Sequence, residues 1–167
     1  RKGKIVESEK LTYVPKEQIL SSGDIVLTYE RYSVKKQNNT IFPIIKLGDI
    51  CIIGDGNHSS NYPKSSEMIE EGVPFIRATN LKNGKVNDND ILFVSTEKHL
   101  ELKKGHLRTG DVIFCNRGEI GKSAIVGKDF NNSNLNSQLA WIRPNDNILS
   151  RFLYNILQTE QIKSIVE

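Results

Sequence analysis

Cysteine is scarce in this chain of 167 residues, and its two copies are not placed for a disulfide framework or a zinc site. Cys51 and Cys115 are far apart, and the sequence contains no Cys-x-x-Cys pair. The three histidines, His58, His99 and His106, show no ligand spacing either. Isolated thiols of this kind are typical of proteins from a reducing compartment. We therefore expect both thiols to be free and buried, and we expect no structural metal.

Long apolar segments are also missing. No run approaches the roughly 20 residues that a membrane-spanning helix needs, and the first residues are charged, so no secretion signal is visible. These absences predict a cytoplasmic protein without a membrane partner. The chain begins with Arg1 rather than Met, which leads us to expect a piece of a longer polypeptide. Its length predicts one domain, or one domain with an appendage.

Motifs that carry catalysis are absent as well. The sequence has no Gly-x-Ser-x-Gly nucleophile elbow, no His-Glu-x-x-His zinc motif and no Gly-x-Gly-x-x-Gly dinucleotide fingerprint. Its acidic residues form no nuclease-like cluster. We therefore expect these residues to be non-catalytic and to bind no cofactor. An active site assembled in space from distant residues stays open as an alternative.

One stretch, GEIGKS at positions 118–123, resembles a phosphate-binding loop of nucleotide-binding proteins. That loop requires Gly, four residues and then Gly-Lys-Ser or Gly-Lys-Thr, followed by a helix. Its first glycine would stand at the position of Asn116, and the residues that follow, SAIVGKDF, favour a strand. The stretch therefore predicts a tight turn between two strands that carries Arg117, Glu119 and Lys122 outward.

The apolar pattern divides the chain into three regions, 1–44, 45–146 and 147–167. The first is mixed and polar, the second alternates short β-rich runs with turn residues, and the third has helical periodicity. The expected strands are 44–53, 73–78, 91–95, 111–116, 122–126 and 138–143, and short helices are expected near 66–71 and 96–103. Gly-Asp pairs that precede apolar runs are predicted to be turns, at 23–24, 48–49 and 110–111.

The last region is the clearest helix, and either Asn147 or Ser150 is placed to cap its start. Its apolar residues form one stripe, at Ile148, Phe152, Leu153, Ile156 and Leu157. Together with the strand pattern, this helix predicts an α+β fold: a β-rich α/β unit with a twisted sheet, short helices and exposed loops, followed by a C-terminal helix.

Polar loops between the expected strands are the strongest functional signal. Basic and amide side chains contact DNA phosphates and base edges, where Arg pairs with guanine and Asn or Gln with adenine. The net charge of +3 permits a nucleic-acid partner without requiring one. The candidate DNA-binding residues are Asn57, His58, Ser59, Tyr62, Arg77, Asn80, Lys82, Arg117, Lys122, Asn136 and Gln138.

Several of these positions have a structural alternative. The segment 55–64 can be a solvated surface loop, and Arg77 can pin the end of a strand through carbonyl groups. Trp141 can belong to the core instead of stacking on a base, and Arg143, which precedes Pro144, can be an ordinary strand-end residue.

From about Ile45 to its end the chain resembles the target recognition domains of type I restriction–modification specificity subunits. The similar stretches, in matching order and spacing, are KLGDICIIGDGNHSSNY, GVPFIRATNLKNGKV, LKKGHLRTGDVIFCNRGEIGKSAIV, NSQLAWIRP and RFLYNILQTEQIK. The resemblance implies an α/β unit whose loops read half of a split site in double-stranded DNA. It also implies a long spacer helix that packs against its counterpart, and a recognition domain without catalytic residues.

The same resemblance implies partner proteins: an N6-adenine methyltransferase subunit and, in restriction complexes, a translocating endonuclease subunit. Residues 117–122 correspond to the family's Arg-Gly-Ser-Ile-Gly turn, in which Glu119 replaces the usual small residue. Glu119 then points away from DNA, accepts a cytosine amino group, or belongs to a purely structural turn. After His58 the segment is longer and more polar than the Thr-Pro that is common in the family.

Residues 1–44 resemble the tail of N6-adenine methyltransferase domains, through the Leu-x-x-x-Arg-Tyr pattern of Leu27, Arg31 and Tyr32. This implies a parent in which methyltransferase and recognition domain are fused, as in type IIG-like enzymes. S-adenosylmethionine is then expected only in the missing methyltransferase domain or in a partner. The alternative is a separate specificity subunit with an N-terminal extension.

These observations predict a sequence-specific double-stranded DNA recognition module that directs adenine methylation, accompanied by cleavage where the system restricts DNA. The alternative function is a protein-interaction module whose working surface is the stripe on the C-terminal helix.

Overall fold

A computed structural model describes Val14 and residues 16–20, 42–58 and 60–166. The chain divides into two units, Arg1–Ile44 and Ile45–Glu167, and each is considered by itself. In the first unit the described residues form a short helix, α1 (Lys16–Leu20). The expected turn at 23–24 and the methyltransferase-like pattern at 27–32 lie outside the described residues.

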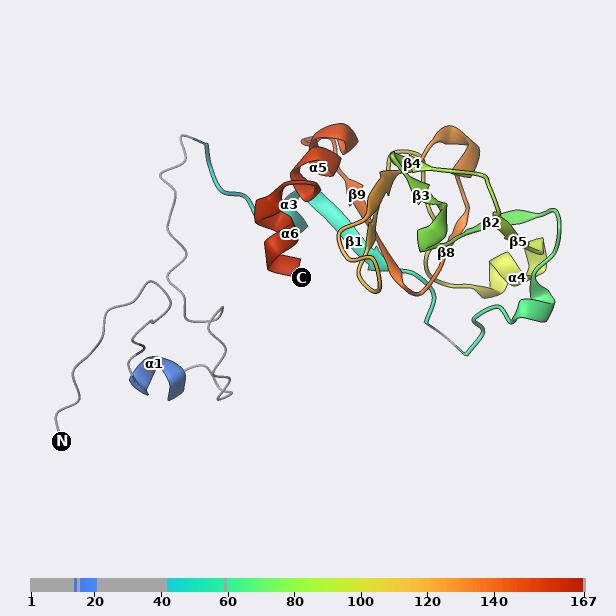
Figure 1. The fold of residues 1–167 in the computed structure, drawn as a ribbon, viewed down its shortest axis with the longest axis horizontal. Helices are drawn as coiled ribbons and strands as arrows, with labels where there is room; N and C mark the ends of the chain where they lie inside the picture. Colours follow the sequence, from blue (N-terminus) through green and yellow to red (C-terminus); the bar gives the residue numbers. More distant parts are fainter. Residues whose placement is uncertain (1–13, 15, 21–41, 59, 167) are drawn as a thin grey trace. The chain divides into compact units, whose positions relative to one another are not determined.

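The second unit is built on two β-sheets (Figure 1). The larger sheet has six strands in the spatial order β1 (Cys51–Asp55), β9 (Leu139–Pro144), β6 (Val112–Cys115), β7 (Ser123–Ile125), β4 (Gly84–Val86) and β3 (Leu81–Lys82). The smaller sheet has the order β5 (Leu92–Val94), β2 (Val73–Ile76) and β8 (Asn134–Leu135). Strand pairs are antiparallel except for β4 with β7 and β2 with β8, which are parallel.

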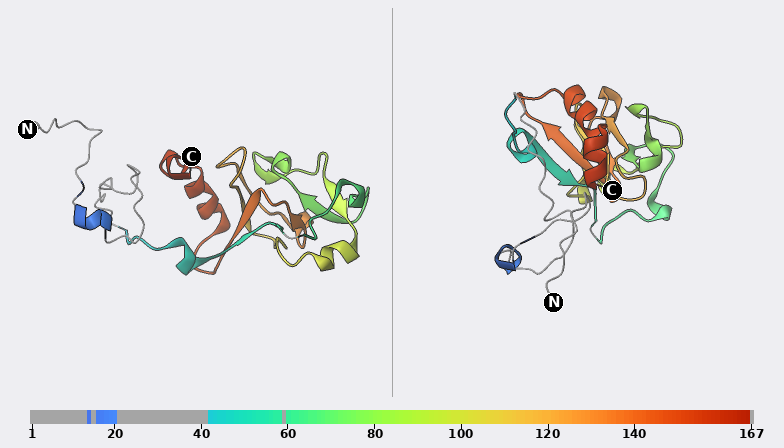
Figure 2. Two further views of the ribbon diagram at one scale, coloured as in Figure 1. Left: turned by 90° about the horizontal axis from the view of Figure 1, so that it is seen from below. Right: turned by 60° about the vertical axis from the view of Figure 1, so that its left-hand side comes forward.

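Short helices accompany the sheets. They are α3 (Leu47–Ile50), α4 (Thr96–Glu101), α5 (Ser150–Leu157) and α6 (Glu160–Val166), with the 3-10 turns η1 (Ser65–Glu67), η2 (Ala78–Asn80) and η3 (Lys128–Phe130). Figures 1 and 2 place the α5–α6 pair at one end of this unit and the smaller sheet with α4 at the other. None of the helices formed by the described residues combines the length and the apolar composition that crossing a bilayer requires.

Strand β6 separates two cores because successive side chains of a strand point to opposite faces. Val112 packs with Leu153 and Leu157 of α5 in one cluster on the helix side of the larger sheet. Ile113 and Cys115 belong to a second cluster, which the larger sheet shares with residues of the smaller sheet. The apolar run that identified this strand in the sequence therefore packs on both faces and holds the layers together.

A third cluster lies beneath the smaller sheet, where Phe75, Val94 and Leu102 are completely buried. The two cysteines, Cys51 and Cys115, are both free and buried, as the sequence predicted. Burial raises the pKa of the Cys51 thiol above its usual range.

Each expected strand overlaps an observed one, but the first begins later than predicted. Residues 47–50 form one helical turn, α3, so the pair Gly48-Asp49 lies within a helix and not in a turn before a strand. The pair Gly110-Asp111 is a turn as predicted, with Gly110 at φ +91°. The helix expected at 66–71 is reduced to the 3-10 turn η1, while α4 confirms the expected helix at 96–103.

The C-terminal region forms two helices, and the prediction of one continuous helix was wrong. The break lies at Gln158 and Thr159, where the Gln158 side chain donates to Ser123 Oγ of β7 at 2.7 Å. Thr159 Oγ1 donates back to the carbonyl of Ile156 at 2.8 Å, which competes with regular helix hydrogen bonding. The expected caps were also wrong, because Leu149 precedes the helix and Ser150 Oγ donates to the Gly110 carbonyl at 2.6 Å.

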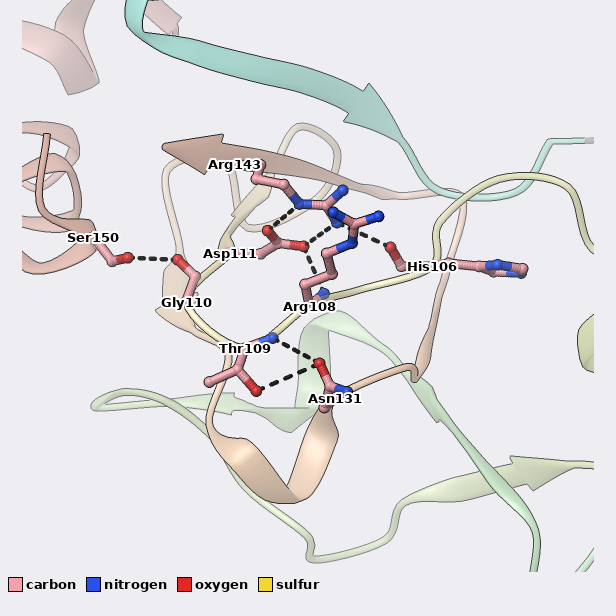
Figure 3. A network of polar contacts seen from close by, with 8 residues as sticks. All are labelled: His106, Arg108, Thr109, Gly110, Asp111, Asn131, Arg143 and Ser150. Carbon is pink, nitrogen blue, oxygen red and sulfur yellow. Dashed lines mark hydrogen bonds and ion pairs between the residues drawn. The ribbon is translucent and has the colours of Figure 1, made fainter. Parts of the chain in front are cut away.

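A buried ion pair ties the loop before β6 to strand β9 (Figure 3). Asp111 is 1% exposed, and Arg143 binds both of its carboxylate oxygens, from Nε and Nη2, at 2.8 Å each. The Arg108 N–H donates to the same carboxylate at 2.8 Å, and Arg143 Nη2 also reaches the His106 carbonyl at 3.2 Å. The guanidinium lies 4.5 Å from the centre of the Trp141 ring. Arg143 is therefore a structural residue, and more than an ordinary end of a strand.

We expect Arg143→Ala to lower the free energy of unfolding by about 3 kcal/mol, because it leaves Asp111 as an uncompensated buried carboxylate. Urea unfolding at pH 7 would measure this change. The control is Glu160→Gln, which removes the exposed ion pair with Lys163 and should change stability by less than about 0.5 kcal/mol. Equal effects of the two substitutions would contradict the role given to the buried pair.

Candidate nucleic-acid interface

Two parallel strands bring separate polar segments to one edge of the smaller sheet. Strands β2 and β8 pair in parallel, with Ile76 opposite Leu135, so Arg77 and Asn136 both emerge where the strands end. The main-chain N–H of Asn136 donates to the Ile76 carbonyl at 2.9 Å and continues the ladder by one residue. Residues 59 positions apart in sequence are thereby neighbours, because parallel strands run out at the same edge.

The loop that follows β1 reaches the same edge. Gly56 donates to the Leu139 carbonyl at 2.9 Å, and Asn57 donates to the Leu135 carbonyl at 3.2 Å. A Cβ atom at Gly56 would overlap the main-chain oxygen of Asn136, so only glycine allows this approach. The loop then carries Tyr62 back to the strand ends, where its hydroxyl accepts a hydrogen bond from Asn136 Nδ2 at 2.8 Å.

Tyr62 is held on an apolar support. Its ring meets Phe75 edge to face, with 5.7 Å between centroids. Burial raises the pKa of the Tyr62 phenol, although hydrogen bonds from Ser137 and Asn136 and the charge of Arg77 act in the opposite direction. The phenol is therefore neutral near pH 7, with a proton that it can donate to an acceptor.

Asn136 positions its neighbours. Its Oδ1 accepts from the Gln138 N–H at 2.7 Å while its Nδ2 donates to Tyr62, so both ends of the amide are engaged within the protein. The side chain of Gln138 is exposed beside it. This arrangement presents the Gln138 amide to solvent on a backbone that Asn136 holds in place.

Arg77 and Asn80 form a compact local structure after β2. The Asn80 Oδ1 accepts from the Arg77 N–H at 2.9 Å and its Nδ2 donates to the Asn89 carbonyl at 3.1 Å. Asn80 is only 1% exposed, so its amide holds the loop and could contact a base only after rearrangement. Arg77 Nη2 donates to the Asp90 carbonyl at 2.6 Å, which is the carbonyl-pinning alternative considered for this side chain.

The residues at the start of the loop after β1 differ in exposure. Asn57 is 1% exposed and belongs to the buried part of the loop, whereas His58 is exposed. Ser59 lies outside the described residues. Of the two predicted contacts that the structure describes, His58 has its side chain on the surface and Asn57 does not.

The turn between β6 and β7 confirms the reading of GEIGKS as a strand connection. Gly118 and Gly121 adopt φ +79° and +84°, and the Cys115 N–H donates to the Lys122 carbonyl at 2.8 Å. Glu119 is engaged with Lys122 Nζ, which lies 3.1 Å from both carboxylate oxygens. The acid therefore offsets the charge of that lysine on the surface of the turn.

This turn adjoins the strand ends described above. The Asn116 N–H donates to the Gln138 carbonyl at 3.3 Å, and the exposed Arg117 follows directly. We call the group Tyr62, Arg77, Arg117, Asn136 and Gln138 the polar surface. Lys82, by contrast, is exposed on β3, at the edge of the larger sheet, and no hydrogen bond joins it to the polar surface.

A stacked histidine pair supports β8 from within. The His99 and His106 rings lie 4.4 Å apart at 19°, and the Asn134 side-chain amide is 2.9 Å from His99 Nδ1. Burial, followed by the neighbouring His106, lowers the pKa of His99 and outweighs the Asn134 contact. No spacing rule in the sequence pointed to this pair, because seven positions separate residues that meet only through the fold.

Sequence reasoning also missed two lysines beside the loop after β1. Lys103 and Lys104 are exposed and line one hollow together with His58. The signal available was a pair of adjacent lysines directly before Gly105, a pattern that also suits an ordinary helix end.

Comparisons by sequence found related proteins. A family model described as "Type I restriction modification DNA specificity domain" matches residues 42–166. The type I restriction enzyme EcoBI specificity subunit of Escherichia coli is 31% identical over 81 residues, which is 48% of this chain and 17% of that protein.

Two solved structures share the fold. The HsdS subunit from Thermoanaerobacter tengcongensis aligns with a TM-score of 0.59 at 20% identity, over 78% of this chain and 31% of that one. A structure described for complex assembly and conformational transition of the type I R-M system gives a TM-score of 0.59 at 20% identity, over 77% and 32%. This chain spans about a third or less of the length of these relatives.

The two hydrogen bonds of the Asn136 side chain, to Tyr62 and to the Gln138 N–H, lead to a stability prediction. We expect Asn136→Ala to lower the free energy of unfolding by about 1–2 kcal/mol, because it removes two hydrogen bonds and leaves the Gln138 N–H without its acceptor. Gln138→Ala is the control, and we expect a change below about 0.5 kcal/mol because its side chain is exposed. Urea unfolding of both variants checks this, and equal losses would contradict a bridging role for Asn136.

The histidine pair yields a pH prediction. The folded-state pKa of His99 lies below the unfolded value of 6.5, so its contribution to stability is complete above pH 6.5 and is lost as the pH falls through the folded pKa. We expect the fall in unfolding free energy between pH 7.5 and pH 5 to be smaller in His99→Gln than in the wild type. His58→Gln, which removes an exposed histidine, is the control. Identical pH profiles for wild type and His99→Gln would contradict the prediction.

Proposed function

Because the chain belongs to the family of type I restriction modification DNA specificity domains, we propose that residues 45–146 recognise part of a specific sequence in double-stranded DNA. The observation that carries this proposal is the convergence of three separate loops on the polar surface. Arg77 and Gln138 follow strands β2 and β8, which pack in the core, and Tyr62 is joined to them through its hydrogen bond with Asn136. Rigid elements that present a few polar side chains suit direct reading of base edges.

The internal hydrogen bonds of the polar surface distinguish the side chains that can contact DNA from the side chain that orients its neighbours. Gln138 is exposed and its amide can form the two hydrogen bonds that adenine offers in the major groove. Arg117 is exposed on a turn, where a cation can contact a phosphate or a guanine. Tyr62 offers a phenol proton, while Asn136 orients Tyr62 and Gln138 without needing to touch DNA.

The pair α5–α6 supplies a surface for assembly with other chains. Its outward apolar side chains include Phe152 at 57% exposure and Ile165 at 60%, next to Leu149 at 76%. A contiguous patch of exposed apolar side chains is typical of protein interfaces, and we propose that these residues form such a patch. We place the start of the spacer helix here, and with it the contact to a methyltransferase subunit or domain and, in restricting systems, to an endonuclease subunit.

In this scheme the parent protein binds S-adenosylmethionine only through its methyltransferase partner or domain. Residues 1–44 are the proposed tail of such a domain in a fused parent, and a separate specificity subunit is the alternative. The recognition unit selects the DNA sequence, and the partner catalyses adenine methylation.

Selection from a randomised duplex-DNA pool across a salt series tests the proposal with the full-length protein. We expect enrichment of one short sequence and affinity that falls as salt rises, because phosphate contacts release counterions. Gln138→Ala should relax specificity at one base pair, with a loss of about 1–3 kcal/mol of discrimination.

The matched control is Gln161→Ala, an exposed amide on α6, which should leave both the enriched sequence and its affinity unchanged. Weak binding without enrichment by the full-length protein would refute DNA recognition. The interaction module would then be favoured, in which Phe152→Ser abolishes partner binding while Arg77→Ala, Arg117→Ala and Lys122→Ala leave it intact.

A further inference from the structure

The hollow beside the loop after β1 lies on the side of α4. It has a volume of about 280 Å³ and is lined by Asn57, His58, Asn61, Glu101, Lys103 and Lys104. Two of these side chains are lysines, one residue beyond the end of α4, and a third is the exposed His58. The hollow therefore combines hydrogen-bond donors from the loop with a pair of cations from a different element.

The lysine pair is held in place by its neighbours on both sides. Leu102 is completely buried among Phe75 and Val94, which anchors the residue before the pair. Gly105 follows the pair at φ +72°, and a Cβ atom there would lie 3.2 Å from both Gly56 Cα and the Leu135 carbonyl oxygen. This close approach fixes the lysines beside the loop and beside the strand that leads to the polar surface.

The ion pairs near this hollow leave the charges of its two lysines available to bind an anion. Among the residues that the structure describes, neither Lys103 nor Lys104 takes part in an ion pair, and both are exposed. The one acid of the hollow, Glu101, lies 3.0 Å from Lys98 Nζ, which also binds Glu67 at 2.7 Å. The Glu101 carboxylate is therefore already compensated from outside the hollow.

We propose that Lys103 and Lys104, with His58 beside them, bind backbone phosphates of the double-stranded DNA whose bases the polar surface reads. This inference rests on the proposed function and adds to it the element that sets the register of the duplex. A lysine is a point charge on a flexible stem, which suits a phosphate better than a base edge. Contacts to phosphate position a protein on DNA and carry no sequence information of their own.

The test is the salt dependence of binding by the double variant Lys103→Gln, Lys104→Gln in the full-length protein. Each lost phosphate contact reduces the slope of log K against log salt by about 0.9, so we expect a reduction of about 1.8. The sequence enriched from a randomised duplex pool should stay the same. Lys103→Arg, Lys104→Arg keeps both charges and should restore the wild-type slope.

The control removes two equally exposed lysines elsewhere, Lys46→Gln with Lys128→Gln, and should leave the slope unchanged. If both double variants reduce the slope equally, the effect is one of net charge and the inference is overturned. An unchanged slope in the Lys103, Lys104 variant, with wild-type enrichment intact, overturns this inference alone. If the wild type itself enriches no sequence, the proposed function fails, and the inference fails with it.

Discussion

The buried Asp111 carboxylate is the constraint on which the rest of the second unit depends. An ionised carboxylate is costly to bury unless a charge and hydrogen bonds compensate it. Arg143 provides the charge and two hydrogen bonds, and the Arg108 N–H provides a third. The loop before β6 and the C-terminal end of β9 are consequently locked together. Since β9 lies between β1 and β6, this lock fixes the part of the larger sheet that these three strands form.

A continuous series of hydrogen bonds and ring contacts connects this ion pair to the polar surface. Arg143 also binds the His106 carbonyl, and the His106 ring stacks on His99, which meets Asn134. Asn134 opens β8, and β8 ends at the residue before Asn136. The side chains that we propose for DNA recognition are therefore held by a layered interior, while the α5–α6 pair lies at the opposite end of the unit from α4 (Figure 1).

Sequence patterns predicted an element well where it contains a run of apolar residues. Strand β6 was predicted because VIFC is a continuous apolar run, while β3, β4 and β8 were missed because each carries a single apolar residue. The break in the C-terminal helix was missed for another reason. It depends on the hydrogen bond from Gln158 to Ser123, and residues 35 positions apart leave no local signal.

The sequence by itself determined the class of the fold, the family, the glycine turn at 118–121 and the types of side chain available for recognition. Local rules suffice for these, because backbone geometry and alternation depend on neighbouring residues. Only the tertiary structure decided which of these side chains face solvent. Asn80 and Gln138 carry the same amide group, yet Asn80 is buried against its own loop and Gln138 is exposed. Burial is the sum of contacts from distant segments, so the same chemistry serves the interior at one position and the surface at the other.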